Sequence, residues 1–365
     1  MKSLPIIYST AFAAAFLVSA ILTAVVKKLA LTTGFVAHPR QDRFHKETTA
    51  MGGGIAIFAT IALFCITAVI LVQVRSATLA NKIDISLSDF AGKIQQLVII
   101  LACSAVLFAL GLWDDIKNIG PGTKLLVQFA AAFIAAYFAE VRVELFIENK
   151  IITSIISAFW IVLIINVFNF LDNMDGASAG IALIVSIILF FTSTLSGQIL
   201  VSGFALLFAG TLTGFLVFNF FPASIFMGDA GSLVVGFFVA LLTLRTTYYQ
   251  HIETDRWYIV FMPLIIMALP LYDFTSVTLL RIKQGKSPFV GDTQHFSHRL
   301  KKRGLSEIQT VLTLYLATLT TGLGAIVLKI LDSAYGMFVF IQTIMVLAII
   351  AILESTGQND ISRQQ

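Results

Sequence analysis

Long apolar stretches separated by short polar segments run through nearly the whole chain. Many of them contain about 20 apolar residues, the length that an α-helix needs to cross a hydrocarbon core of roughly 30 Å. The pattern predicts an all-α, polytopic membrane protein with a single transmembrane domain over residues 1–365 and about eleven spanning helices (ten to twelve). The expected helices cover residues 5–26, 51–74, 94–112, 124–139, 152–171, 178–196, 198–219, 229–246, 257–280, 309–330 and 337–353.

The composition agrees with a membrane protein. Apolar residues make up 58% of the chain and charged residues 12%, about half of what soluble domains carry. This excludes a DNA-binding protein, a secreted disulfide scaffold and a disordered linker. Cys65 and Cys103 lie inside apolar stretches, which is typical of small core residues. The first stretch is longer than a signal-peptide core and precedes Lys27-Lys28, so we expect it to be the first span.

Alternation of the helices divides the loops into two sets, and one set contains the majority of the 24 Lys and Arg residues. The positive-inside tendency places this set in the cytoplasm and the N-terminus outside. Every polar cluster with catalytic character falls in the same set. We therefore predict a cytoplasm-facing site at the membrane surface. The clusters lie at 40–45, 114–115, 166–175, 228–229 and 292–303.

Two adjacent carboxylates, Asp114 and Asp115, end the third expected helix. Like charges disfavour one another, and both carboxylates are costly at a membrane boundary, so a divalent cation or a transferred proton would stabilise them. The alternative is a pair of solvated residues at a helix end.

Four polar side chains then recur every third residue, at Asn166, Asn169, Asp172 and Asp175. Neighbours at this spacing share a helix flank, so each successive pair can meet. Such residues are expensive in lipid, which favours a functional site. Hydrogen bonds between helices are the structural alternative.

Asp229 lies among small residues at the start of a later apolar helix. Free N–H groups and the positive end of a helix dipole at such a position suit phosphate oxygens, although Asp229 could instead be the N-cap. The acidic segments contain Asp and no Glu, with Lys124 just after the first pair. They fit Mg²⁺, for which Mn²⁺ can substitute, and transfer of a phosphoryl-type group.

The segment 281–308 is predicted to be a cytoplasmic basic loop with two histidines, His295 and His298, and the cation Arg299 close to them. Such a cluster can bind a diphosphate through charge-assisted hydrogen bonds. A juxtamembrane patch that attracts anionic lipid is the alternative.

With these motifs in order, the sequence resembles the polyprenyl-phosphate N-acetylhexosamine-1-phosphate transferases from about residue 34 to 310. The resemblance rests on the aspartate pair followed by Lys124-Leu-x-x-Gln128, the run from Asn166 to Gly176, the segment 226–233 and the histidine loop. It implies a UDP-N-acetylhexosamine and a polyprenyl phosphate as substrates, with Mg²⁺. The lipid phosphate would attack the β-phosphate and release UMP, in a bacterial cytoplasmic (inner) membrane. No nucleic acid is implied, and a homodimer is a candidate assembly.

The resemblance also implies residue roles. Asp229 would be the main Mg²⁺ ligand, helped by Asn169, and Asp114 or Asp115 would deprotonate or orient the lipid phosphate. The other candidates would bind or position the nucleotide sugar. These are Lys124, Asn166, Asp172, Asp175, His295, His298 and Arg299.

The histidine loop resembles the branch that transfers N-acetylglucosamine 1-phosphate. That branch usually has His-x-His-His, where this chain has Ser297 at the middle histidine, and often has Asp where this chain has Ala37. A phospho-N-acetylmuramoyl-pentapeptide transferase is the alternative within the family. An ion-coupled secondary transporter, with carboxylates at mid-membrane, is the alternative from another class. An inactive scaffolding member is disfavoured because all metal-type residues are present.

Overall fold

A computed structural model describes residues 4–37, 48–78, 93–143, 147–246, 257–287, 295–330 and 333–356; within these ranges the side chains of 75–78, 257, 298, 302, 333–335 and 354–356 are not described. The described chain is helical apart from two paired strands of two residues each, β1 (Val36–Ala37) and β2 (Thr49–Ala50). The helices are α1 (Leu4–Thr33), α2 (Gly53–Thr78), α4 (Ile94–Ile116), α5 (Pro121–Phe138), α6 (Lys150–Leu171), α7 (Ala177–Leu195), α8 (Ile199–Asn219), α9 (Gly228–Arg245), η1 (Trp257–Phe261), α10 (Met262–Ile266), α11 (Ala268–Lys283), α12 (Phe296–Lys302), α13 (Glu307–Ile330) and α14 (Ser333–Thr356).

The helices are those of a multi-pass membrane protein. Ten in the described ranges are long and apolar enough to cross a membrane, or eleven when one bent pair counts as a span, which confirms the predicted number. Large apolar side chains remain exposed on α1 and α14, such as Leu17, Ile21, Phe338 and Ile344. An apolar outer surface of this extent is stable against lipid rather than water. Helix α1 continues beyond the predicted end at residue 26 to Thr33, because Lys27 and Lys28 are good helix formers with long aliphatic stems.

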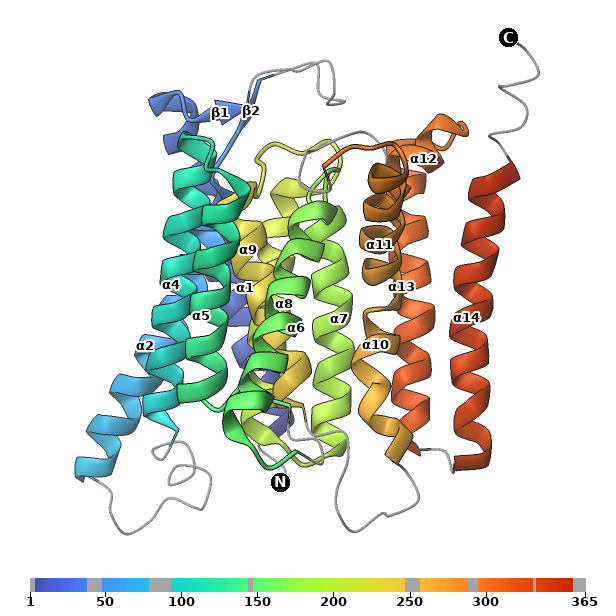
Figure 1. Ribbon diagram of the computed structural model, residues 1–365. Helices are drawn as coiled ribbons and strands as arrows, with labels where there is room; N and C mark the ends of the chain where they lie inside the picture. The colour runs from blue at the N-terminus through green and yellow to red at the C-terminus, as the bar shows by residue number, and fades with distance from the viewer. Residues whose placement is uncertain are drawn as a thin grey trace.

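Helix α9 forms the centre of the bundle (Figure 1). Every residue from 230 to 243 is buried, and α2, α4, α6 and α7 pack around it. Two glycines allow the closest approaches. A Cβ at Gly54 of α2 would lie 2.2 Å from the Gly231 nitrogen, and one at Gly111 of α4 would lie 2.5 Å from the Ala230 nitrogen. The backbones of α2 and α4 therefore meet the first turn of α9, where Asp229 lies.

The expected helix 257–280 is wrong as a single straight element. Residues Tyr258–Ile266 and Ala268–Lys283 are inclined at 66° to each other across a break at Met267. Pro270 explains the break, because it has no N–H for the Ile266 carbonyl and its ring clashes with that carbonyl in a continuous helix. The bend directs α11 toward the end of the bundle that carries α12.

The polar segments gather at one end of the bundle, where Figure 1 shows β1, β2 and α12. The chain around β2 is joined to the segment before α9: Phe226 N–H donates to the Ala50 carbonyl (2.9 Å) and Gly53 N–H to the Phe226 carbonyl (2.8 Å). The segment 281–308 is not wholly a loop, since α11 extends to Lys283 and α12 occupies 296–302. Residues 38–47 and 288–294, which contain much of the predicted first loop and Asp292, lie outside the described ranges.

Candidate active site

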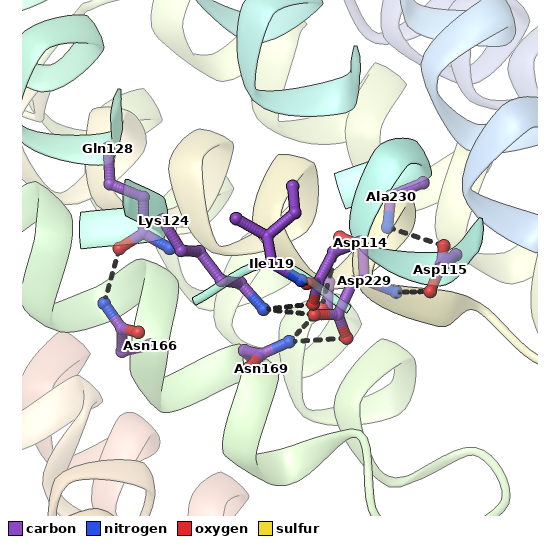
Figure 2. A network of polar contacts seen from close by, with 10 residues as sticks. Asp114, Asp115, Ile119, Lys124, Gln128, Asn166, Asn169, Asp229 and Ala230 are labelled. Carbon is purple, nitrogen blue, oxygen red and sulfur yellow. Dashed lines mark hydrogen bonds and ion pairs between the residues drawn. The ribbon is translucent and has the colours of Figure 1, made fainter. Parts of the chain in front are cut away.

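Two aspartates and a lysine from three helices meet at this polar end. Asp114 lies in the last turn of α4, Lys124 in the first turn of α5 and Asp229 at the second position of α9. The Lys124 ammonium donates to Asp114 Oδ2 (3.0 Å) and also to Asp229 Oδ2 (Figure 2). Ile119 N–H donates to the other oxygen of Asp114 (2.7 Å). One cation therefore binds two carboxylates that are more than 100 residues apart in the sequence.

Asn169 of α6 completes the group. Its Nδ2 donates to Asp229 Oδ1 (3.0 Å) and to Ser232 Oγ (2.9 Å), so the start of α9 is fixed from two sides. We call Asp114, Asp115, Lys124, Asn169 and Asp229 the carboxylate cluster. The Asp229 side chain retains 29% exposure, so a substrate group can reach it from the polar end.

Asp115 has a different environment from its neighbour. Its two carboxylate oxygens accept the N–H groups of Asp229 (2.8 Å) and Ala230 (3.1 Å), in the first turn of α9. A negative charge at this position also interacts favourably with the helix dipole. Two expectations need correction. Asp229 is not the N-cap of α9, and these two N–H groups are not free for phosphate, because Asp115 binds both.

Asn166 lies apart from the carboxylates. Its Nδ2 donates to Gln128 Oε1 on α5 (2.8 Å) and to the Val162 carbonyl in its own helix (2.8 Å). In Figure 2 this pair is to the left of Lys124 and the aspartates are to its right. At this position the structure agrees with the alternative of a hydrogen bond between helices.

The two remaining acidic candidates follow α6. Asp172 is the C-cap residue of that helix and is partly buried. Asp175 is buried, and its Oδ2 accepts the Ala223 N–H (2.8 Å) from the segment between α8 and α9. Asn219 connects the same two segments, since it accepts the Gly176 N–H and donates to the Ile225 carbonyl. Asp175 therefore holds the chain that leads into α9.

The basic segment forms a second group, next to the C-terminal end of α6. Asp273 of α11 accepts the Phe296 N–H (2.7 Å), and its other oxygen lies 3.4 Å from His295 Nδ1. Arg299 Nη2 donates to Ser276 Oγ on α11 (2.7 Å), and Arg281 lies over the Phe170 ring. We call Asp273, Arg281, His295 and Arg299 the histidine cluster. His298 belongs to α12, but its side chain lies outside the described part of the structure.

Several residues in these contacts were not among the predicted site residues. Asp273 was recognisable as a lone charge in an apolar stretch, but its partners were not. Ser232 and Asn219 flank the Asp229 motif without a spacing that indicates their contacts. Asn173 accepts a hydrogen bond from Ser297 (2.7 Å), and nothing in the sequence indicates that pair.

The oxygen ligands of the carboxylate cluster are suited to a hard cation. Carboxylates of Asp114 and Asp229 and the side-chain oxygen of Asn169 are ligands of the kind that Mg²⁺ prefers. The Lys124 ammonium between the two carboxylates marks a position that already holds positive charge. Among the described residues there is no group of three or more His, Cys, Asp or Glu that could hold a metal ion. Two carboxylates and one amide oxygen are a donor set that fits Mg²⁺, which usually shares its coordination with substrate phosphates and water.

The fold and this cluster define a polytopic membrane protein whose site, built from carboxylates and one lysine, lies at one end of the bundle. Residues 97–247, which include the whole carboxylate cluster, match the family described as glycosyl transferase family 4. This match confirms the resemblance that the motifs indicated, and together with the relatives below it supports a phosphoglycosyl transferase.

Relatives from bacteria extend over most of the chain. A Bacillus subtilis (strain 168) protein named probable undecaprenyl-phosphate N-acetylglucosaminyl 1-phosphate transferase is 28% identical over 358 residues, 95% of this chain and 91% of the relative. Proteins named undecaprenyl-phosphate alpha-N-acetylglucosaminyl 1-phosphate transferase are 25% identical in Escherichia coli (strain K12), over 85% of this chain and 80% of the relative, and 24% identical in Yersinia pestis, over 86% and 81%.

Proposed function

We propose that this protein transfers N-acetylglucosamine 1-phosphate from UDP-N-acetylglucosamine to undecaprenyl phosphate or a similar polyprenyl phosphate. The products are polyprenyl-diphosphate N-acetylglucosamine and UMP, as in the first membrane step of cell-surface polysaccharide synthesis. The names of the bacterial relatives support this choice of sugar and lipid. The observation that carries the proposal is the meeting of Asp114, Lys124 and Asp229 within the segment that matches the family.

In this reaction an oxygen of the lipid phosphate attacks the β-phosphorus of the nucleotide sugar. A new P–O bond forms, the bond from the β-phosphorus to the bridging oxygen breaks, and UMP leaves with the electron pair. The protein mainly positions the reactants and stabilises charge. Asp114 is our candidate for orienting the lipid phosphate and accepting its proton, because Asp115 is engaged at the start of α9.

Mg²⁺, or Mn²⁺ in its place, would be held by Asp229 and Asn169 and would neutralise charge on the diphosphate. The oxygen donors described above support this assignment. Lys124 is placed to bind phosphate oxygens when it exchanges one of its two carboxylate partners. Lys124 then balances charge on the leaving UMP, while Asn169 keeps the Asp229 carboxylate oriented.

The histidine cluster would bind the phosphate and sugar through His295 and Arg299, together with His298. Its contacts with Phe170, the residue after Asn169 of the carboxylate cluster, support a division between acidic and basic halves. Asp172, Asp175 and Asn166 are proposed to position the nucleotide by fixing α6 and the segment before α9. We place this end in the cytoplasm of a bacterium, on the charge distribution of the loops.

The test is release of UMP by the full-length protein in detergent with Mg²⁺, polyprenyl phosphate and UDP-N-acetylglucosamine. We expect UMP that requires the lipid and the metal and that disappears on chelation. The Asp229→Asn protein, purified in parallel, is the matched control for a contaminating activity. Reaction with UDP-N-acetylgalactosamine or UDP-N-acetylmuramoyl-pentapeptide instead would contradict the sugar. No UMP from any of the three would contradict the transferase.

A further inference from the structure

A buried carboxylate outside the family match holds the start of the basic helix α12. Asp273 is 2% exposed and lies in α11, at the end of the bundle that carries the site. An ionised carboxylate at such a position is expensive unless hydrogen-bond donors face it. Its two oxygens face two consecutive residues, with the Phe296 N–H at 2.7 Å and His295 Nδ1 at 3.4 Å. Asp273 thus contacts both the backbone of Phe296 and the imidazole ring of His295.

The backbone contact replaces a missing cap. His295 is the N-cap residue of α12, and its side chain makes no capping hydrogen bond to its own helix. Phe296, the first residue of the helix, donates its N–H to Asp273 instead. The Asp273 carboxylate on α11 therefore accepts an N–H at the start of α12, where many helices have a Ser or Asp side chain at the N-cap as the acceptor. The position at which α12 begins is set by α11.

The ring contact selects one form of the histidine. A neutral imidazole whose Nδ1 faces a carboxylate carries its proton on Nδ1 and leaves Nε2 as the acceptor nitrogen, which suits a sugar hydroxyl as its partner. His295 is 5% exposed, and its ring meets the Phe170 ring edge to face, with centroids 5.6 Å apart. Phe170 follows Asn169, which binds Asp229. The ring of His295 is therefore held between α11 and the α6 residue that adjoins the carboxylate cluster.

We propose that Asp273 is a positioning residue for the transfer reaction, which orients the His295 ring and fixes the start of α12 so that its basic side chains meet the nucleotide sugar. This inference rests on the proposed function. Asp273 acts through His295 and does not touch the reacting atoms.

Asp273→Asn separates orientation from folding. The amide oxygen of the variant still accepts the Phe296 N–H, so α12 keeps its start. The amide NH₂ now faces Nδ1 as a donor, so the ring proton moves to Nε2. We expect kcat/KM for the nucleotide sugar to fall about ten- to hundredfold, mainly through KM, because Nε2 becomes a donor and no longer accepts a sugar hydroxyl. KM for the polyprenyl phosphate stays unchanged.

Ring ¹⁵N signals of the full-length protein, labelled at its five histidines, report the tautomer without any turnover. His295→Gln assigns the His295 signal by its disappearance. We expect that signal to move from the Nδ1-protonated to the Nε2-protonated pattern in Asp273→Asn. Thr275→Ala, on the same helix, is the matched control, because the Thr275 hydroxyl bonds carbonyls of its own helix; its signals and kinetics stay as in the unsubstituted protein.

A double-mutant cycle then decides how Asp273 acts. If it acts through His295, the protein with both Asp273→Asn and His295→Gln is no slower than the one with His295→Gln alone. Losses that multiply, or an unchanged His295 signal in Asp273→Asn, would overturn the positioning role while UMP release by the unsubstituted protein upholds the proposed function. Absence of UMP release from the unsubstituted protein would overturn that function itself.

Discussion

The carboxylate cluster and the histidine cluster lie at the same end of the bundle and carry opposite formal charge. The first contains three aspartates and one lysine, and the second contains one aspartate with Arg281 and Arg299. Asn169 belongs to the first and Phe170 packs against the second, so consecutive residues of α6 face the two regions. Acidic and basic halves are thus arranged around one helix end. Such a pair is suited to a cation on one side and phosphate oxygens on the other.

The two regions share one structural arrangement, but it presents different side chains in each. In each, a carboxylate on a neighbouring helix accepts N–H groups at the start of another helix: Asp115 for α9 and Asp273 for α12. The helix held by Asp115 presents an acid, Asp229, while the helix held by Asp273 presents cations. A negative charge near the site therefore need not be catalytic. Its hydrogen-bond partners decide whether it binds substrate or backbone.

Replacing Asp229 by Asn should have the largest effect and sharpens the assignment of chemistry to the carboxylate cluster. The change removes a proposed metal ligand and one of the two carboxylate partners of Lys124. We expect turnover to fall on the order of a thousandfold, because a group that would stabilise the charge of the transition state is lost. UMP release under Mg²⁺ saturation measures it. Activity within tenfold of the unsubstituted protein would remove Asp229 from the site.

The carboxylate cluster was largely predictable from the sequence, and its geometry was not. Asp114, Asp229 and Asn169 stand out because polar residues at the ends of apolar helices are costly. Which of the adjacent aspartates faces the site depends on the rotation of α4 against α9, which Gly111 permits through a close backbone approach. A packing contact between distant segments leaves no local signal, so Asp114 and Asp115 looked alike.

Lys124→Met tests whether the lysine and a metal share the space between Asp114 and Asp229. Without the ammonium the two carboxylates lose their common partner, so the protein is less stable and turnover falls about a hundredfold. Added Mg²⁺ should raise the Tm of this variant more than that of the unsubstituted protein, because the metal can replace the missing charge. Lys124→Arg, which retains the charge, is the matched control. An equal rise in both proteins would argue that the metal binds elsewhere.

Asp115→Asn and Asp114→Asn, prepared as separate variants, test whether Asp115 binds backbone and Asp114 binds substrate. The amide in Asp115→Asn retains one acceptor oxygen for two N–H donors, so unfolding becomes easier by about 1–3 kcal/mol and activity drops about tenfold through the displaced Asp229. The amide in Asp114→Asn can still accept the Ile119 N–H, and Lys124 keeps Asp229 as its charged partner, so the Tm changes less while turnover falls further. Thermal unfolding in detergent and UMP release would be measured on both. If Asp114→Asn lowered the Tm more and Asp115→Asn lowered turnover more, the roles of the two aspartates would be exchanged.

The histidine cluster was less predictable. The sequence indicated the basic character of 281–308 and its histidines, but not that 296–302 is helical. That helix has seven residues, and contacts from α11 and the 172–176 segment hold it through Asp273, Ser276 and Asn173. Short helices form through tertiary contacts more than through intrinsic propensity. The bend at Met267, which Pro270 imposes, brings α11 to this position.

Asn166→Ala should have the smallest effect, and it tests the border of the carboxylate cluster. Asn166 and Asn169 are three residues apart on α6, but Asn166 donates to Gln128 and Asn169 to Asp229. Loss of one hydrogen bond between membrane helices costs about 0.6 kcal/mol, so we expect a small fall in Tm and turnover within about threefold. Asn169→Ala, prepared alongside, should lose roughly a hundredfold because it supports a proposed metal ligand. Equal losses in the two variants would extend the site along α6 to Gln128 and return Asn166 to the substrate-binding residues.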